Sequence, residues 1–216
     1  SGSIEKCGNG NWAHCTVFSF HPVKHIACGE GGMITTNDEE IYKKLLLYRS
    51  HGITKDESLL TRNEGGWYYE MHELGFNYRL SDIHAALGTT QLSRIEENVR
   101  KRNEIALKYR EAFENVQQIT IQKENKSGTH AYHLFVIEID DRKGLYDFLR
   151  SKNIFCQVHY IPVHLLPYYE RLGWKKGDLP NAEAYYSRCL SLPMFPTLTT
   201  EEQDYVIKSV KSYFND

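Results

Sequence analysis

The chain has 216 residues, of which 25% are charged and 41% are apolar, and its formal net charge is −2. These values are ordinary for a soluble globular protein with one large or two small domains, and they favour neither nucleic acid nor an anionic membrane as a partner. No window approaches the roughly 18 apolar residues that a membrane span needs. The five cysteines form no C-x-x-C pair and the ten histidines no H-E-x-x-H, so we expect reduced thiols, a cytoplasmic setting and no metal site.

The first 36 residues predict a hairpin. Residues 1–3, Ser-Gly-Ser, look like a cloning scar, and residues 4–15 show no clear period, as if the chain entered in the middle of a fold. A short apolar run then delivers Ser19, His21 and Lys24 to its end. The turn Gly29-Glu30-Gly31-Gly32 follows, and residues 33–36 form a second β-type run.

Two helices and a long loop are expected next. Asn37-x-x-Glu40 resembles a capping box, and the apolar face behind it predicts a helix that ends near Gly52. Residues 53–72 form a loop whose run Trp67-Tyr68-Tyr69 argues for order and contact. Ser81 or Asp82 can cap a long amphipathic element that runs to about residue 114, as two helices or one bent helix.

The pattern changes after a polar break, and the second half predicts a small α/β layer. We place the large domain at residues 4–120 and the small domain at 121–216. The expected elements are strands at Ala131–Ile139 and Ile154–Tyr160, a short helix around Leu145–Leu149, a helix Ala182–Leu190 after Asn181, and a terminal helix that starts at the capping box Thr199-Thr200-x-x-Gln203 and points Val206, Val210 and Phe214 inward.

Lys24 is the first candidate for chemistry. It follows a buried-looking strand and faces a glycine turn, and a neutral amine in such a place can form a Schiff base with a carbonyl. Ser19, five residues earlier, could donate a hydrogen bond to a phosphate. This pair suits pyridoxal phosphate chemistry, which needs an amine, a phosphate site and a base. The alternative is an ordinary solvated surface lysine.

Two further groups of polar residues are candidates for binding. Asn77 and Arg79 precede a helix N-terminus, where an amide, a guanidinium fork and the helix dipole favour an anion. A turn and a surface ion pair would explain the same two residues. His159 and Tyr160 end a strand-like run closed by a proline, which suits a substrate edge, but on chemistry alone the residues favour a histidine satisfied in the core or at the surface.

These segments together resemble a known family. Residues 17–24 with Gly29-Glu30-Gly31-Gly32 look like the cofactor-lysine segment of the DegT/DnrJ/StrS sugar aminotransferases. The resemblance continues through residues 48–52, 74–80, 82–88, 157–162 and 191–193, in the family's order. It implies an α/β protein of fold type I, the aspartate aminotransferase-like fold, present as a partial large domain and a C-terminal small domain. The run from Trp67 to Met71 is most similar to the branch that makes the 4-amino sugar precursor of pseudaminic acid.

The resemblance also implies roles. Lys24 would form the internal aldimine with pyridoxal 5′-phosphate, and Ser19 would bind the cofactor phosphate. Asn77 would reach the phosphate of a neighbouring subunit, which requires a homodimer with shared active sites. His21 and Arg79, with His159 and Tyr160, would line the nucleotide-sugar pocket. The implied reaction moves an amino group from glutamate to a 4-keto nucleotide sugar.

One departure from the family pattern limits this expectation. Members of the family have a comparably long stretch upstream, with the aromatic that stacks on the cofactor ring and the aspartate that pairs with its nitrogen. Without them the electron sink is weakened, so we expect the 216 residues alone to bind the cofactor poorly. The alternatives are a truncated, non-catalytic relative kept for binding or dimerisation, and an aminotransferase for another keto nucleotide sugar.

Overall fold

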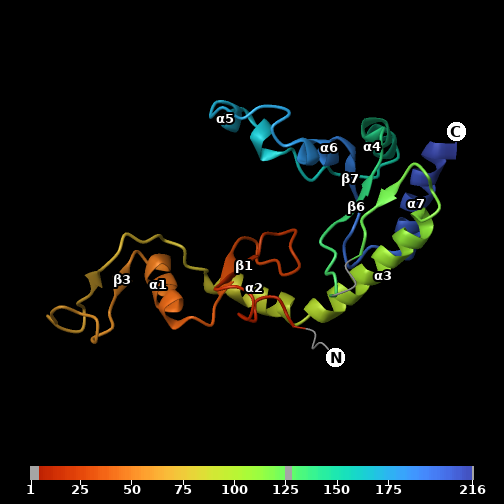
Figure 1. Ribbon diagram of the computed structural model, residues 1–216. Coiled ribbons are helices and arrows are strands. Elements are labelled where there is room, and N and C mark those ends of the chain that lie inside the picture. Colours follow the sequence, from red (N-terminus) through yellow and green to blue (C-terminus); the bar gives the residue numbers. More distant parts are fainter. Residues whose placement is uncertain (1–4, 125–127, 216) are drawn as a thin grey trace. The chain divides into compact units, whose positions relative to one another are not determined.

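The computed structural model describes residues 5–124 and 128–215 (Figure 1). By its contacts the chain divides into two compact units, the first ending at Ile95 and the second beginning at Glu96. This division falls at the start of a long helix, whereas the sequence pattern suggested a domain boundary near residue 120. Within the described residues, no helix is both long enough and apolar enough to cross a membrane.

The first unit opens with the predicted hairpin. Strands β1 (Thr16–Ser19) and β2 (Gly32–Thr35) pair antiparallel, with Ser19 opposite Gly32. Both strands expose apolar side chains: the side chain of Val17 is 72% exposed and that of Met33 is 51% exposed. A two-stranded pair with exposed faces is marginally stable by itself.

Helix α1 (Glu39–Arg49) follows, and its cap differs from the predicted one. The N-cap is Asp38, whose carboxylate accepts hydrogen bonds from the backbone N–H groups of Glu40 and Ile41 at 2.9 and 3.0 Å. The capping box from Asn37 is therefore wrong: the Asn37 amide instead donates to the Asn9 carbonyl at 2.8 Å. A carboxylate one residue later satisfies two orphan N–H groups at once.

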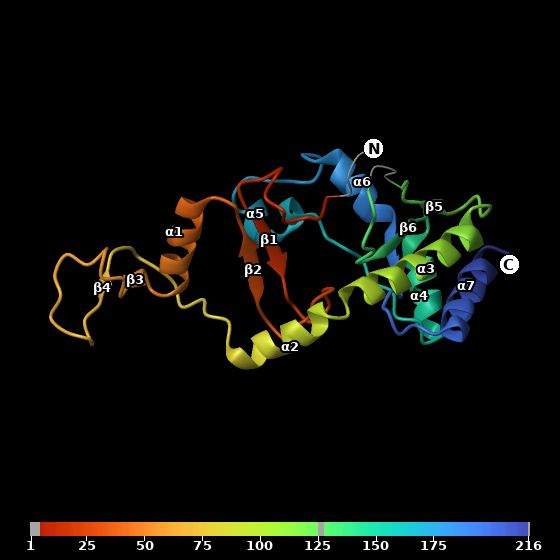
Figure 2. The same cartoon turned by 90° about the horizontal axis from the view of Figure 1, so that it is seen from below.

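The expected loop contains a second, shorter hairpin and leads to another helix. Strands β3 (Ile53–Thr54) and β4 (Glu70–Met71) pair antiparallel. Helix α2 (Asp82–Leu92) begins at the N-cap Ser81, one of the two predicted caps, and runs past the β1–β2 hairpin (Figures 1 and 2). Helix α3 (Ile95–Phe113) starts three residues later, so the amphipathic stretch forms two helices.

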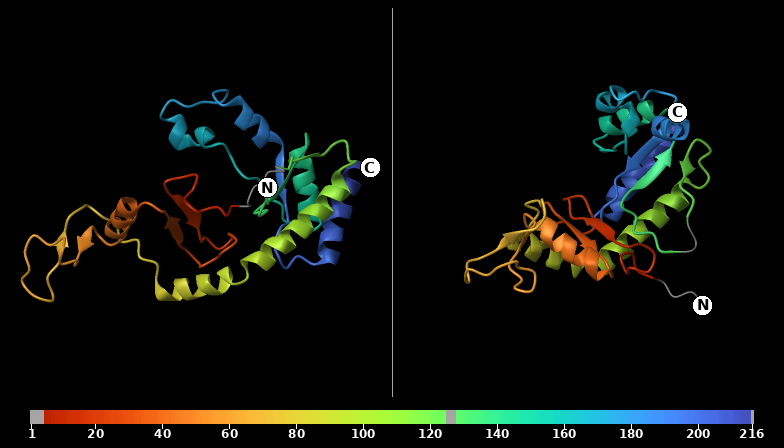
Figure 3. Two further views of the ribbon diagram at one scale, coloured as in Figure 1. Left: turned by 60° about the horizontal axis from the view of Figure 1, so that its bottom comes forward. Right: turned by 60° about the vertical axis from the view of Figure 1, so that its left-hand side comes forward.

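The second unit is a three-stranded antiparallel sheet with helices packed on it. Its strands are β5 (Thr120–Ile121), β6 (Phe135–Glu138) and β7 (Cys189–Leu192), in the order β5-β6-β7. The helices are α3, α4 (Arg142–Ser151), a 3₁₀ turn at Val163–Leu165, α5 (Pro167–Glu170), α6 (Pro180–Arg188) and α7 (Thr200–Asn215). Figure 3 shows α3 and α7 side by side, where the buried Gln203 amide donates to the Ile105 carbonyl.

Three predictions for this half are corrected. Ile154–Tyr160 is not a strand: it meets β7 only in a bridge between Gln157 and Ser191, and Tyr160 is 67% exposed. The predicted helix over 182–190 begins at Pro180 and ends at Arg188, since Cys189–Leu192 is a fully buried strand. The capping box of α7 joins Thr199 to Glu202, with bonds of 2.9 and 3.2 Å, and does not involve Thr200 and Gln203.

One core lies in the second unit. Its buried residues come from α3, β6, α4, β7 and α7, and include Tyr109, Phe113, Leu145, Leu149 and Val210, each 0% exposed. The inward direction of Val206 and Val210 is confirmed, and Phe214 packs against the cluster.

Arg102 of α3 is buried beside this core. It is 6% exposed, and its Nη1 donates to the carbonyls of Tyr132, His133 and Met194 at 3.0, 3.3 and 3.0 Å. Desolvation lowers the pKa of its guanidinium. The side chain thus ties helix α3 to two segments far along the chain.

Candidate active site

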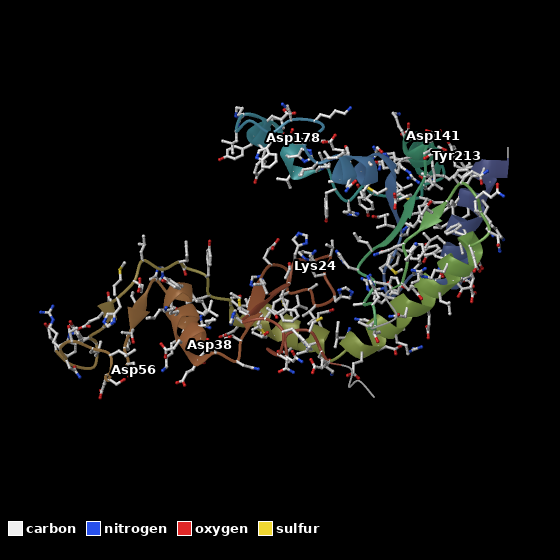
Figure 4. All side chains as sticks on the ribbon, in the orientation of Figure 1. Lys24, Asp38, Asp56, Asp141, Asp178 and Tyr213 are labelled. Atoms are coloured by element: carbon white, nitrogen blue, oxygen red, sulfur yellow. The ribbon has the colours of Figure 1, made fainter. Side chains whose placement is uncertain are left out.

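The β1–β2 hairpin gathers three of the candidate residues at one end. Ser19 is the last residue of β1, and His21 and Lys24 follow in the loop that leads back to β2, where Figure 4 labels Lys24. The loop forms because Lys24 N donates to the His21 carbonyl at 2.9 Å, closing a turn directly after the strand. Amine, imidazole and hydroxyl are therefore carried on six consecutive residues beside a glycine turn.

These three side chains differ in their surroundings. Lys24 is half-buried, whereas Ser19 and His21 are exposed. The Ser19 hydroxyl accepts a long hydrogen bond of 3.5 Å from His21 N, and the His21 ring lies 4.0 Å from the Glu30 carboxylate across the glycine turn. The hydroxyl thus remains accessible to a ligand at the end of the strand.

Asn77 and Arg79 lie on a segment that is hydrogen-bonded to the end of α1. Asn77 forms an antiparallel bridge with Ser50, and the neighbouring Tyr78 N donates to the Arg49 carbonyl at 2.9 Å. Close approach is possible because Gly52 has a positive φ of 70°, and a Cβ there would lie 1.8 Å from the Glu73 carbonyl oxygen. Both side chains are exposed, which suits groups that meet a ligand or another chain.

His159 and Tyr160 belong to the second unit. The His159 Nδ1 is 2.8 Å from the hydroxyl of Ser191, a buried residue of β7, and its ring meets that of Tyr160 edge-on at 4.6 Å. Strand β7 therefore orients the histidine.

A network around Glu70 was not predicted. The carboxylate accepts hydrogen bonds from Thr61 N and Oγ1, from the Tyr68 hydroxyl at 3.0 Å and from His72 Nε2 at 2.7 Å. These bonds, led by the Thr61 hydroxyl, hold the pKa of Glu70 far below its ordinary value. The loop is ordered, as expected, and the Glu70 carboxylate holds it together, whereas the sequence had pointed to the aromatic run Trp67-Tyr68-Tyr69.

The residues present fit one kind of cofactor. A half-buried amine on a loop, an accessible hydroxyl at a strand end and an exposed amide and guanidinium suit an aldehyde that carries a phosphate. Among the described residues, no group of three or more His, Cys, Asp or Glu side chains could hold a metal ion.

The comparison with protein families identifies the family of the chain. The sequence profile of the DegT/DnrJ/EryC1/StrS aminotransferase family matches residues 5–211. The chain belongs to this family. The match includes the hairpin with Lys24, the segment with Asn77 and Arg79, and the His159–Tyr160 pair.

Curated relatives of the family resemble the chain over nearly its whole length. It is 38% identical to the spore coat polysaccharide biosynthesis protein SpsC of Bacillus subtilis, over 94% of the chain and 54% of the relative. It is 35% identical to a UDP-4-amino-4,6-dideoxy-N-acetyl-beta-L-altrosamine transaminase of Campylobacter jejuni, over 91% of the chain and 51% of that protein. The chain thus spans about half the length of the curated relatives it matches.

Solved structures of family members share the fold. PseC of Helicobacter pylori, an aminotransferase involved in pseudaminic acid biosynthesis, superposes with a TM-score of 0.85 and 31% identity, covering 96% of the chain and 55% of PseC. The sugar aminotransferase Spr1654 of Streptococcus pneumoniae, in its PMP form, also gives 0.85 with 30% identity, over 94% of the chain and 54% of its own. The predicted family and the fold type I α/β class are therefore confirmed.

Proposed function

We propose that the full-length protein containing this chain is a pyridoxal-phosphate-dependent aminotransferase that moves an amino group from glutamate to a 4-keto nucleotide sugar. The observation that carries the proposal is the half-buried Lys24 on the β1–β2 loop, within a family match that spans residues 5–211. The relative named as an altrosamine transaminase supports a UDP-linked 4-keto-6-deoxy-N-acetyl sugar as the acceptor.

Each residue has one task in this proposal. Pyridoxal phosphate, when bound, supplies an electron sink at the carbon that exchanges its amino group. Lys24 Nζ holds the cofactor and moves the proton at the sugar C4, while the Ser19 hydroxyl binds the phosphate. His21, Arg79, His159 and Tyr160 bind the nucleotide sugar, and a guanidinium suits its diphosphate.

A homodimer follows from the task of Asn77. Its exposed amide reaches the cofactor phosphate of a second copy, so each active site needs two chains. The prediction is that Asn77→Ala subunits mixed with Lys24→Ala subunits recover activity, because half of the sites in a mixed dimer are intact. No recovery on mixing would contradict the shared site.

Cofactor attachment tests the proposal directly. The full-length protein is incubated with pyridoxal phosphate, reduced with borohydride and digested, and the modified peptide is identified by mass spectrometry. We expect the cofactor on Lys24, no attachment in Lys24→Ala, and transfer from glutamate reduced at least about a thousandfold in that variant. The matched control is Lys44→Ala on α1, an exposed lysine that should change neither readout. Attachment elsewhere, or a fully active Lys24→Ala enzyme, would overturn the proposal.

The identity of the acceptor sugar needs its own test, because an aminotransferase for another keto nucleotide sugar is the alternative. SpsC, a spore coat polysaccharide biosynthesis protein, is 38% identical to the chain and the altrosamine transaminase 35%, so identity does not single out one sugar. Values of kcat/KM for a panel of UDP- and dTDP-linked 3-keto and 4-keto sugars discriminate the two. A preference of at least about tenfold for the UDP-linked 4-keto-6-deoxy-N-acetyl sugar is expected, and a preference for any other member would reassign the substrate.

A further inference from the structure

The loop that carries Lys24 is closed on itself. This lysine loop, residues 20–31, is held at its base because Phe20 N donates to the Gly31 carbonyl and Cys28 N to the Phe20 carbonyl, both at 2.9 Å. Phe20 is 7% and Cys28 0% exposed, so the base of the loop is buried while its tip is not. The residues that pack against this buried base therefore determine the position of Lys24 on the loop.

The base of the lysine loop packs on one row of residues at helix α2. His84 and Gly88 are four residues apart in α2 and lie on one face, and Leu80 directly precedes the N-cap Ser81. A Cβ at Gly31 would lie 2.7 Å from Leu80 Cδ1, and a Cβ at Gly88 would lie 2.6 Å from the Cys28 sulfur. A larger residue at either glycine would therefore have to displace the Leu80 or the Cys28 side chain.

His84 makes the middle contact, and its ring is oriented from the other side. The Ser81 hydroxyl accepts from His84 N at 3.4 Å and lies 2.8 Å from His84 Nδ1. The Ser81 hydroxyl therefore contacts both the backbone and the ring of His84 and orients the ring through Nδ1. The opposite edge of the ring faces Gly29, where a Cβ would lie 3.3 Å from Cδ2 and 3.4 Å from Nε2.

We propose that His84 is a positioning residue for Lys24: its ring, oriented by Ser81, sets the distance between helix α2 and the Gly29 turn and so holds the lysine loop in place. The proposal rests on the proposed function for its catalytic consequence, but its structural part holds without any cofactor. A side chain that fixes the loop acts on the geometry of the reacting amine, and misplacement of about 1 Å can cost up to about a hundredfold in rate.

Two substitutions separate the parts of the ring. His84→Asn keeps an amide near the Nδ1 position but lacks the edge that reaches Gly29, whereas His84→Gln keeps the reach and gives up the bond to Ser81. His84→Ala removes both. Thr90→Ala is the matched control, since Thr90 is an exposed residue of the same helix whose hydroxyl donates only to the Ala86 carbonyl.

The first readout is amide hydrogen exchange of the cofactor-free full-length protein at Phe20 and Cys28. We expect exchange about tenfold faster in His84→Ala and His84→Asn, within about threefold of wild type in His84→Gln, and unchanged in Thr90→Ala. Unchanged exchange in His84→Ala would overturn the proposal. Exchange raised equally throughout α2 would also overturn it, because it would mean a general loss of stability.

The second readout is turnover of the loaded enzyme. We expect kcat to fall about tenfold in His84→Ala with KM for glutamate within about twofold, and His84→Gln to restore most of kcat. If wild type takes up no cofactor on Lys24, the proposed function fails while the exchange result still decides the role of His84. If wild type is active and His84→Ala is equally active, the positioning role alone is lost.

Discussion

The two units of the chain are stabilised in different ways. In the second, a continuous cluster of buried side chains runs from Ile105 on α3 to Val210 on α7. In the described part of the first unit, Phe20 and Cys28 are the buried apolar side chains, and neither α1 nor α2 buries a residue completely. Hydrogen bonds and close backbone contacts take the place of a core there.

The candidate residues are divided between the two units. Lys24, Ser19, His21, Asn77 and Arg79 all belong to the unit with few buried contacts. His159 and Tyr160 belong to the second unit, where His159 Nδ1 lies 2.8 Å from the Ser191 hydroxyl of β7. Four changes test how far the two units differ, in order of expected size.

Truncation of a core residue should have the largest effect. Leu149→Ala in α4 leaves a cavity at a fully buried position and should lower the free energy of unfolding by about 3 kcal/mol. Val17→Ala in β1 is the control, because Val17 is 72% exposed, and should change it by less than about 0.5 kcal/mol. Urea unfolding followed by circular dichroism measures both. Equal losses would mean that the hairpin shares the stability of the core.

Thiol labelling sharpens the comparison without mutation. Cys7 and Cys15 are exposed and should react with iodoacetamide at once, while Cys28, Cys156 and Cys189 are buried. Burial raises the pKa of Cys156 to about 12, which further slows its reaction at pH 8. In dilute urea Cys28 should react at least about tenfold faster than Cys156, because the first unit opens more readily. Simultaneous labelling, detected by peptide mass spectrometry, would show a single cooperative unit.

Acid should loosen the Glu70 network. Hydrogen bonds depress the pKa of Glu70 in the folded state. The carboxylate therefore contributes its full share of the folding free energy above its unfolded pKa of about 4.3, and this share declines as the pH falls below that value. The protection of the Thr61 and Arg62 amides, measured as their exchange rate relative to that of an unstructured peptide at the same pH, should fall below this pH, because their N–H groups donate to the carboxylate. Glu70→Gln should show low protection at every pH, and wild-type protection that does not change with acid would refute the role of the carboxylate.

The smallest effect is expected at the cap of α1. Asp38→Ala removes the acceptor for two N–H groups and should cost the helix about 1 kcal/mol, seen as faster exchange of Glu40 and Ile41. Asn37→Ala tests the rejected cap and should leave these two amides unchanged. The reverse order would restore the capping box from Asn37.

The sequence predicted elements better than it predicted their ends. Periodicity placed α1, α3, α4 and α7, and the cap at Ser81 placed the start of α2. The sequence placed the cap of α1 at Asn37 and not at Asp38, and it placed the capping box of α7 one residue too late. Neighbouring Asp, Asn and Thr side chains are all suitable caps, and the backbone conformation determines which of them is used. Cys189 and Leu190, the first two residues of β7, were assigned to the end of the preceding helix, because a fully buried strand has no alternation of apolar and polar residues to indicate it.

The candidate site was predictable only in part. The spacing of Ser19, His21 and Lys24 before a glycine turn indicated the hairpin that the structure contains. The roles of these residues depend on the family and remain proposals. His84 was invisible as a separate feature, because its contact with Gly29 joins positions 55 residues apart and no local pattern encodes such a pair.

Arg102 has a consequence for the timing of folding. Its bonds join residues 30 and 92 positions apart, so they close only after long loops have formed. Contacts made late slow unfolding far more than they speed folding. Arg102→Met keeps the aliphatic stem but leaves three backbone carbonyls without their hydrogen-bond donor. We expect this variant to unfold faster than the wild type, whereas its refolding rate should barely change. Stopped-flow kinetics in urea measures both limbs. The buried Arg102 guanidinium would then lengthen the lifetime of the native sheet by slowing its unfolding.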